Sequence, residues 1–147
     1  MHLRVIEVRL AEHEELRKII HDLPFYEHFV FAGFPSAASD YFKQKLDLNQ
    51  HLIKHPESTY FVRVHGDSME GAGIHSGDIL IVDRALEPAD NNVIVACIGG
   101  DLIVKRLRII EGRYFLFSEN ENYLPIEITP DIDFDIFGVV LHAIHKV

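Results

Sequence analysis

A chain of 147 residues, 48% hydrophobic and 25% charged, suffices for one globular domain with a hydrophobic core and an appended segment. Its 14 basic and 23 acidic side chains give a formal net charge of -9, which disfavours wide contact with a phosphate backbone. No stretch approaches the roughly 18 apolar residues of a membrane span, and the charged amino terminus lacks the apolar core of a signal peptide. We therefore expect a cytoplasmic protein with little direct nucleic-acid binding and no membrane attachment.

The amino-terminal part of the chain predicts a small unit followed by a linker. Leu3 to Leu10 alternates apolar and charged residues like a short strand, and Ala11 to Ile20 is rich in helix formers. Leu23 to Pro35 has a proline near each end and a central Ala-Gly pair. This pattern is typical of an extended linker that proteases can reach.

Strands dominate the rest of the chain. Asp47 followed by Gln50 resembles a capping box and predicts a helix that Pro56 closes. Gly99-Gly100 predicts a hairpin turn between two strands. The expected strands are Thr59 to Val64, Asp78 to Asp83, Asn92 to Ile98, Leu102 to Ile110, Tyr114 to Ser118 and Ile136 to Ile144. The sequence thus predicts a mainly β fold with a curled or barrel-like antiparallel sheet, one short helix and an N-terminal arm.

A serine among glycines is the first candidate for chemistry. Ser68 lies in the segment HGDSMEG, residues 65–71, directly after an expected strand. Glycines let the backbone turn sharply, which would expose the Ser68 hydroxyl. The backbone N–H groups of Asp67 and Ser68 could then form an oxyanion hole. Taken alone, the segment favours a plain turn serine that hydrogen-bonds its own backbone.

Lys105 gives this serine a candidate base. Period-2 alternation places Ile103, Lys105 and Leu107 on one strand face, where the lysine is the only charge. Apolar surroundings disfavour the ammonium form and can lower its pKa from about 10.4 toward the roughly 7 to 8 of a general base. The alternative is a lysine whose stem lies along the strand while its amine reaches water.

Three segments of the chain resemble the LexA/UmuD family of self-cleaving serine peptidases, on the UmuD side. They are FPSAASDYFKQKLDLNQHLIKHPESTYFVRVHGDSM, SGDILIVDRA and the closing DIFGVVLH. The resemblance implies that Ser68 is the nucleophile, that Lys105 is the general base, and that the chain cuts its own bond between Ala32 and Gly33. It further implies a homodimer whose cutting is promoted by RecA filaments on single-stranded DNA during the SOS response. The trimmed dimer would assist the UmuC-like catalytic subunit of an error-prone translesion polymerase.

The same resemblance divides the chain into an arm, residues 1–32, that self-cleavage removes, and a peptidase domain, residues 33–147. The approach to the bond, Phe29-Val30-Phe31, is unusually apolar. An alternative function is a regulatory module related to phage or plasmid repressors that lacks a DNA-binding domain. A signal-peptidase relative is a remote third, because no membrane segment is found.

Other reactive side chains have simpler interpretations. His65 and His75 flank the serine and suggest a Ser-His-Asp triad, but surface histidines are favoured. His51 and His55 have a zinc-binding spacing without the glutamate of the metalloprotease motif. Cys97 lies in an apolar run and is expected to be a buried thiol. We therefore expect no metal and no cofactor.

Overall fold

The computed structural model describes residues 23–26 and 43–147, in two compact units that divide between His51 and Leu52. The first unit holds strands β1 (Leu23–Tyr26) and β2 (Lys43–Leu46), which pair antiparallel. β1 begins the segment predicted to be extended. The strand and helix expected before residue 21, like the bond between residues 32 and 33, lie outside the described residues.

The described part of the chain contains little helix. Helix α2 (Leu48–Leu52) follows β2, and the Asn49 N–H donates to Asp47 Oδ1 at 3.0 Å. Asp47 therefore caps the helix, as its position predicted. The helix ends before Pro56, and the next helical element is a single 3-10 turn, η1 (Glu70–Ala72). No helix among the described residues is both long and apolar enough to cross a membrane.

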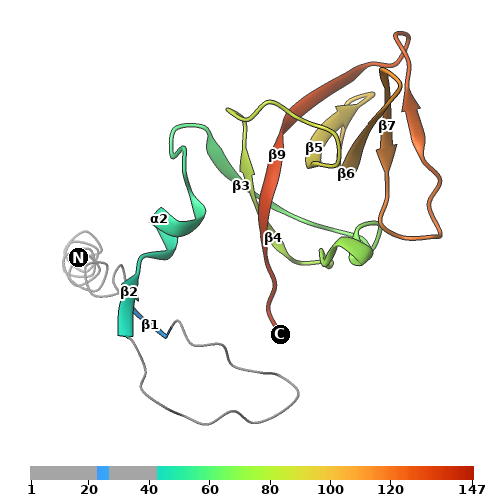
Figure 1. Ribbon diagram of the computed structural model, residues 1–147. Helices are drawn as coiled ribbons and strands as arrows, with labels where there is room; N and C mark the ends of the chain where they lie inside the picture. Colours follow the sequence, from blue (N-terminus) through green and yellow to red (C-terminus); the bar gives the residue numbers. More distant parts are fainter. Residues whose placement is uncertain (1–22, 27–42) are drawn as a thin grey trace, which may run out of the picture. The chain divides into compact units, whose positions relative to one another are not determined.

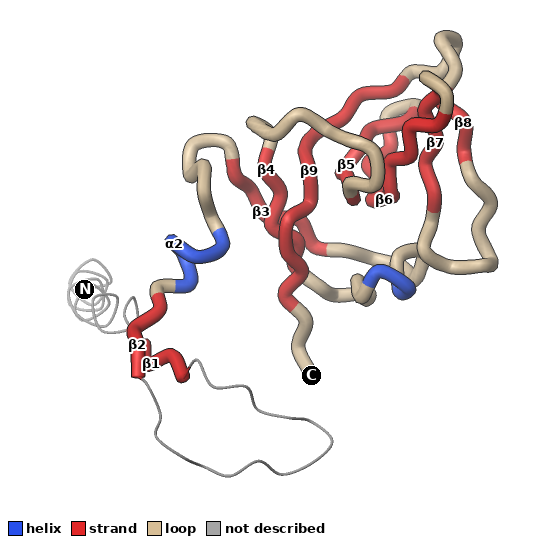
Figure 2. The backbone as a smooth tube through the Cα atoms, viewed as in Figure 1, coloured by secondary structure: helices blue, strands red, loops and turns tan. Residues whose placement is uncertain are grey.

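The larger unit is built on an antiparallel sheet of seven strands in the order β3-β4-β9-β5-β6-β7-β8 (Figures 1 and 2). Its strands are β3 (Thr59–Arg63), β4 (Ile79–Asp83), β5 (Val93–Ile98), β6 (Asp101–Ile110), β7 (Arg113–Phe117), β8 (Ile126–Ile128) and β9 (Phe134–Ile144). The six strands expected between residues 59 and 144 all form, and the mainly β prediction is confirmed. The sheet of the described residues is open, with β3 and β8 at its edges, so it is not a closed barrel.

Turns and bulges shape this sheet. Gly99 and Gly100 have φ of 55° and 90° and join β5 to β6, which is the predicted hairpin turn. The long strand β9 shifts register against both of its neighbours, at Ile81/Val82 in β4 and at Val95/Ala96 in β5. Such bulges bend a strand and increase its twist. They account for the curl of the sheet.

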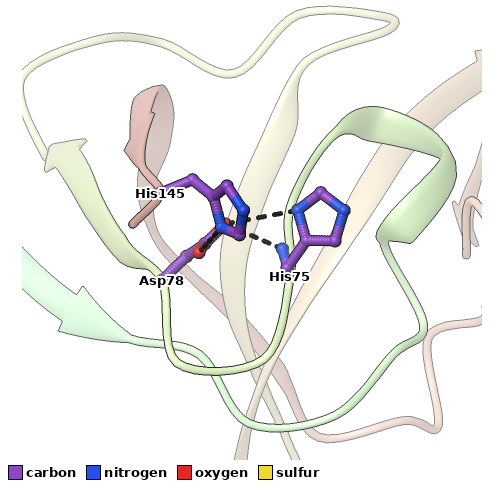
Figure 3. A group of neighbouring side chains, drawn as sticks. All are labelled: His75, Asp78 and His145. Atoms are coloured by element: carbon purple, nitrogen blue, oxygen red, sulfur yellow. Dashed lines mark hydrogen bonds and ion pairs between the residues drawn. The ribbon is translucent and has the colours of Figure 1, made fainter. Parts of the chain in front are cut away.

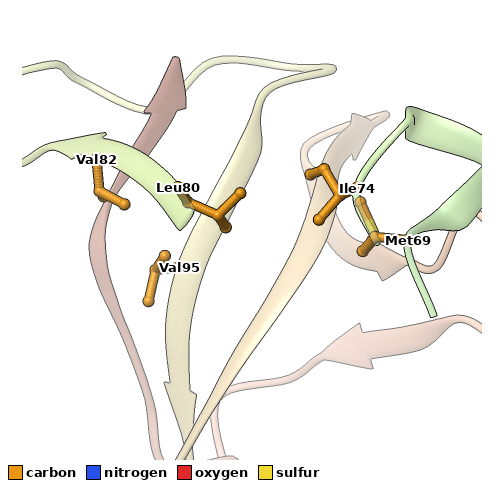
Figure 4. Close-up of a cluster of buried hydrophobic side chains, with 5 residues drawn as sticks. All are labelled: Met69, Ile74, Leu80, Val82 and Val95. Carbon is orange, nitrogen blue, oxygen red and sulfur yellow. The ribbon is translucent and has the colours of Figure 1, made fainter. Parts of the chain in front are cut away.

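Two clusters of buried side chains form the core. The first is Met69, Ile74, Leu80, Val82 and Val95 (Figure 4). The second is Ile94, Ala96, Leu107, Leu116 and Val139. Successive side chains of β6 point to opposite faces of the sheet, so they contact different clusters. Val104 packs against the first cluster and Ile103 against the second. Met69 is 2% exposed, so it anchors the turn that carries Ser68 to the core.

Candidate active site

Ser68 lies in a turn between β3 and η1 and is half-buried. Gly66 begins this turn with φ of 103°, a left-handed conformation that glycine adopts without steric cost. Met69, the next residue after the serine, is buried in the first core cluster. The turn is therefore sharp at its start and fixed at its end, as the glycine-rich sequence predicted.

The loop that follows β7, Ser118–Tyr123, holds the Ser68 turn by its backbone. The Glu119 N–H donates to the Ser68 carbonyl at 2.8 Å, and the Gly71 N–H donates to the Glu119 carbonyl at 2.7 Å. A Cβ at Gly71 would lie 2.6 Å from that carbonyl oxygen. Glycine at position 71 is thus required for the close approach of the two segments.

The same loop also fixes Asp67. Tyr123 donates its hydroxyl to Asp67 Oδ1 at 2.6 Å, and the Asn120 side-chain amide donates to the Asp67 carbonyl at 3.0 Å. The carboxylate beside it raises the pKa of Tyr123 above its ordinary value of 10.0. In the described part of the chain, the N–H groups of Asp67 and Ser68 donate to no backbone carbonyl. The oxyanion-binding role of these two N–H groups stays a prediction.

Lys105 is placed by β6 beside a cavity of about 360 Å³ that Ser68 also lines. Most of the other lining side chains are apolar, among them Val62, Met69 and Val95. Lys105 is half-buried, and burial lowers the pKa of its amine below the ordinary 10.5. This is the direction of shift that its position on an apolar strand face predicted.

The hydrogen bond of the Lys105 amine goes to a residue that sequence reasoning missed. Lys105 Nζ donates to Ser118 Oγ at 2.6 Å and lies 5.1 Å from the ring centroid of Tyr123. The signal for Ser118 was present in the β6–β7 hairpin, where Arg106 pairs with Phe117. The next pair along this ladder is Lys105 and Ser118. The structure therefore brings Ser68 and Lys105 to one cavity, with Ser118 holding the amine.

The histidines make contacts of other kinds. His65 is exposed and lines the same cavity as Ser68. His55 Nδ1 lies 2.5 Å from Oδ2 of the buried Asp83, whereas His51 is exposed. His75 pairs with other residues, described below. This arrangement does not form the Ser-His-Asp triad considered above.

Cys97 corrects one expectation. It is half-buried rather than buried, because it lies near the end of β5 opposite Leu102, which is 63% exposed.

Comparison with known proteins gives consistent matches over most of the chain. Residues 24–141 match the model of the family described as Peptidase S24-like. Protein MucA of Salmonella typhimurium is 43% identical over 126 residues, which cover 85% of this chain and 86% of MucA. Protein ImpA of Shigella flexneri is 41% identical over 123 residues, 84% of this chain and 83% of ImpA. LexA repressor 1 of Pseudomonas putida is 36% identical over 99 residues, 67% of this chain and 48% of the repressor.

Proposed function

Because the chain belongs to the peptidase S24-like family, we propose that it is a serine endopeptidase that cleaves its own Ala32-Gly33 bond. The family implies serine peptidase activity. The observation that carries the finer proposal is that Ser68 and the half-buried Lys105 line one cavity. A lowered lysine pKa increases the fraction of neutral amine, which is the form that accepts a proton.

In the proposed reaction Lys105 is the general base. Its neutral amine takes the proton of the Ser68 hydroxyl while Ser68 Oγ attacks the carbonyl carbon of Ala32. Proton transfer needs Lys105 Nζ and Ser68 Oγ to lie within about 2.6 to 3.2 Å of each other. Before the substrate is in place, such a distance is often longer. The hydrogen bond to Ser118 holds the amine at the cavity until the linker enters.

The tetrahedral intermediate carries a negative oxygen, which the N–H groups of Asp67 and Ser68 would stabilise in this proposal. When the intermediate collapses, the bond to the Gly33 nitrogen breaks and the Lys105 ammonium returns its proton to that amine. The remaining ester between Ser68 and Ala32 is hydrolysed by water, which restores the serine and releases residues 1–32. Residues 33–147 are the proposed product domain.

The cellular role rests on the resemblance of the quoted segments to UmuD. In this proposal the protein is a cytoplasmic homodimer, and RecA filaments on single-stranded DNA promote the cut during the SOS response. The trimmed dimer then assists the UmuC-like catalytic subunit of a translesion polymerase. Membership of the family supports this assignment, and so does the 43% sequence identity to protein MucA, which extends over most of both chains.

The deciding experiment is incubation of the purified full chain with RecA, an ATP analogue and single-stranded DNA, followed by mass measurement of the fragments. We expect a single cut with Gly33 as the new amino terminus. Ser68→Ala and Lys105→Ala should each lose on the order of 10⁴-fold or more of the rate, because a nucleophile and its base act as one unit.

Lys146→Ala is the matched control, since Lys146 is exposed, and it should cut at the native rate. A different new amino terminus would refute the assigned bond. Near-native cutting by Lys105→Ala would refute the dyad.

A further inference from the structure

Three side chains converge where β4 begins and β9 ends, and none of them lines the cavity of Ser68 (Figure 3). His75 and Asp78 flank the turn that leads into β4, and His145 directly follows β9. Because Ile79 pairs with Ile144, the next positions along the ladder bring Asp78 and His145 together. One potential ligand atom from each of the three residues lies within 4.8 Å of the others.

Asp78 is a buried carboxylate at the centre of this cluster, 3% exposed. The His75 backbone N–H donates to its Oδ2 at 2.8 Å, and His145 Nδ1 lies 2.7 Å from its Oδ1. Among the described residues its ion pairs are with the two imidazoles only. A carboxylate buried in this way is stabilised by a neighbouring cation.

His75 supplies a second observation that points to a ligand. Its Nδ1 is shielded from solvent and has no hydrogen-bond partner among the described residues. The atom lies 3.8 Å from Asp78 Oδ2, and the His75 and His145 ring centroids are 4.5 Å apart. A buried nitrogen without a partner is costly, whereas a metal ion would satisfy it.

We propose that His75, Asp78 and His145 bind a divalent cation of the zinc type. Two imidazole nitrogens and one carboxylate oxygen form a donor set typical of Zn²⁺, with metal–ligand distances of about 2.0 to 2.2 Å. Tetrahedral geometry then separates ligand atoms by about 3.4 Å, and the observed contacts of 2.7 and 3.8 Å lie on either side of this value.

Small ring rotations would therefore complete the site. Both imidazoles are 45% exposed, so the fourth coordination position is left to water. The bound ion would fasten the end of β9 to the turn before β4. The sequence pattern alone predicted no metal, because the two histidines are 70 positions apart, from residue 75 to residue 145.

The test uses the full chain and Zn²⁺ alone at neutral pH. Bound zinc is counted after gel filtration, and thermal melting is measured with zinc and with a chelator. We expect wild type to hold one zinc more per chain than His75→Ala or His145→Ala, whose affinity at this site should fall at least about 100-fold. Zinc should raise the melting temperature of wild type by several degrees more than that of either variant.

His142→Ala is the matched control, an exposed histidine on the same strand, and it should behave as wild type. The other histidines are present in wild type and in both site variants, so the difference in zinc content between these proteins isolates the proposed site. His145→Ala also loses a contact to Asp78 and could lower the melting temperature even in chelator. In that case His75→Ala is the deciding variant, because His75 Nδ1 makes no hydrogen bond to another described residue. Equal zinc content and equal melting shifts in wild type and His75→Ala would overturn the proposal.

Discussion

Lys105 has two kinds of neighbour, and each acts on a different property of its amine. The half-buried position beside an apolar cavity lowers the pKa of the amine. The Ser118 hydroxyl, 2.6 Å from Nζ, fixes where the amine lies. The lysine side chain has a flexible stem of four carbons, so holding its amine in a single position costs conformational entropy. Ser118 is therefore a positioning residue for the proposed base.

Ser118→Ala should slow self-cleavage on the order of 10-fold to 100-fold, because the base remains but is no longer held in place. The loss should be smaller than in Lys105→Ala, which removes the base itself. The measurement is the cleavage rate at a fixed pH, with melting temperatures to show that both variants are folded.

Ser118→Thr tests whether the hydroxyl is responsible. Threonine keeps the oxygen that accepts from Lys105 Nζ, so this variant should recover most of the native rate. If Ser118→Ala cuts as fast as wild type, the hydrogen bond seen in the structure has no part in catalysis.

At the scale of elements, two segments far apart in sequence build the site together. The loop Ser118–Tyr123 binds the Ser68 turn through Glu119 and also supplies the acceptor for Lys105. Arg106 also contacts this loop, because its guanidinium donates to the Glu119 carboxylate. The same guanidinium donates to the Asn91 carbonyl. The loop therefore sets the position of the serine relative to the lysine.

Gly71→Ala should separate these segments. The new Cβ meets the Glu119 carbonyl oxygen at 2.6 Å, so the turn and the loop must move apart. Overpacking of this kind costs about 1 to 3 kcal/mol, and the shift of Ser68 should reduce the cleavage rate by at least about tenfold. Rates and melting temperatures are measured in parallel.

Glu70→Ala, an exposed position in the same turn, is the control and should leave the rate unchanged. A Gly71→Ala variant that is destabilised yet cuts at the native rate would show that the contact with Glu119 serves stability alone.

The linker is the other element that the proposed reaction requires. Gly33→Glu places a long charged side chain where the backbone is proposed to pass close to Ser68. Fragment analysis should find the chain intact under conditions that cut wild type completely, while size-exclusion chromatography finds the same oligomer. Efficient processing of this variant would place the scissile bond elsewhere.

Local patterns predicted the strands, the Gly99-Gly100 hairpin and the cap at Asp47, because each depends on neighbours in sequence. β8 was not predicted, because its alternating residues Ile126–Ile128 form a run shorter than the roughly 4 to 8 residues that indicate a strand. The partners of Lys105 and Asp78 were missed for another reason. They follow from strand register: that of the β6–β7 hairpin places Ser118 opposite Lys105, and that of β4 against β9 places His145 opposite Asp78. The second register joins strands far apart in the sequence and is set by tertiary pairing.

For the whole molecule, the proposed reaction depends on where the linker lies. When the linker is away from the cavity, water reaches Lys105 and favours its ammonium form. Docking of Phe29-Val30-Phe31 would cover the cavity with apolar side chains, expel water and lower the pKa further. In this proposal RecA would increase the rate by favouring the docked conformer. Alkaline pH produces neutral lysine directly, so alkali and RecA should be partly redundant.

Self-cleavage without RecA should therefore accelerate as the pH is raised from 7 toward about 10, because only the unprotonated amine accepts the serine proton. The pKa of Lys105 is lowered from 10.5, so the increase should begin below the pH at which an exposed lysine titrates. The hydrogen bond to Asp67 raises the pKa of Tyr123, so this hydroxyl loses its proton at a higher pH than an ordinary tyrosine. Initial rates at each pH, with circular dichroism to show folded protein, provide the test. A flat profile between pH 7 and 10 on folded protein would remove Lys105 as the rate-controlling base, since no other proposed step changes protonation in that interval.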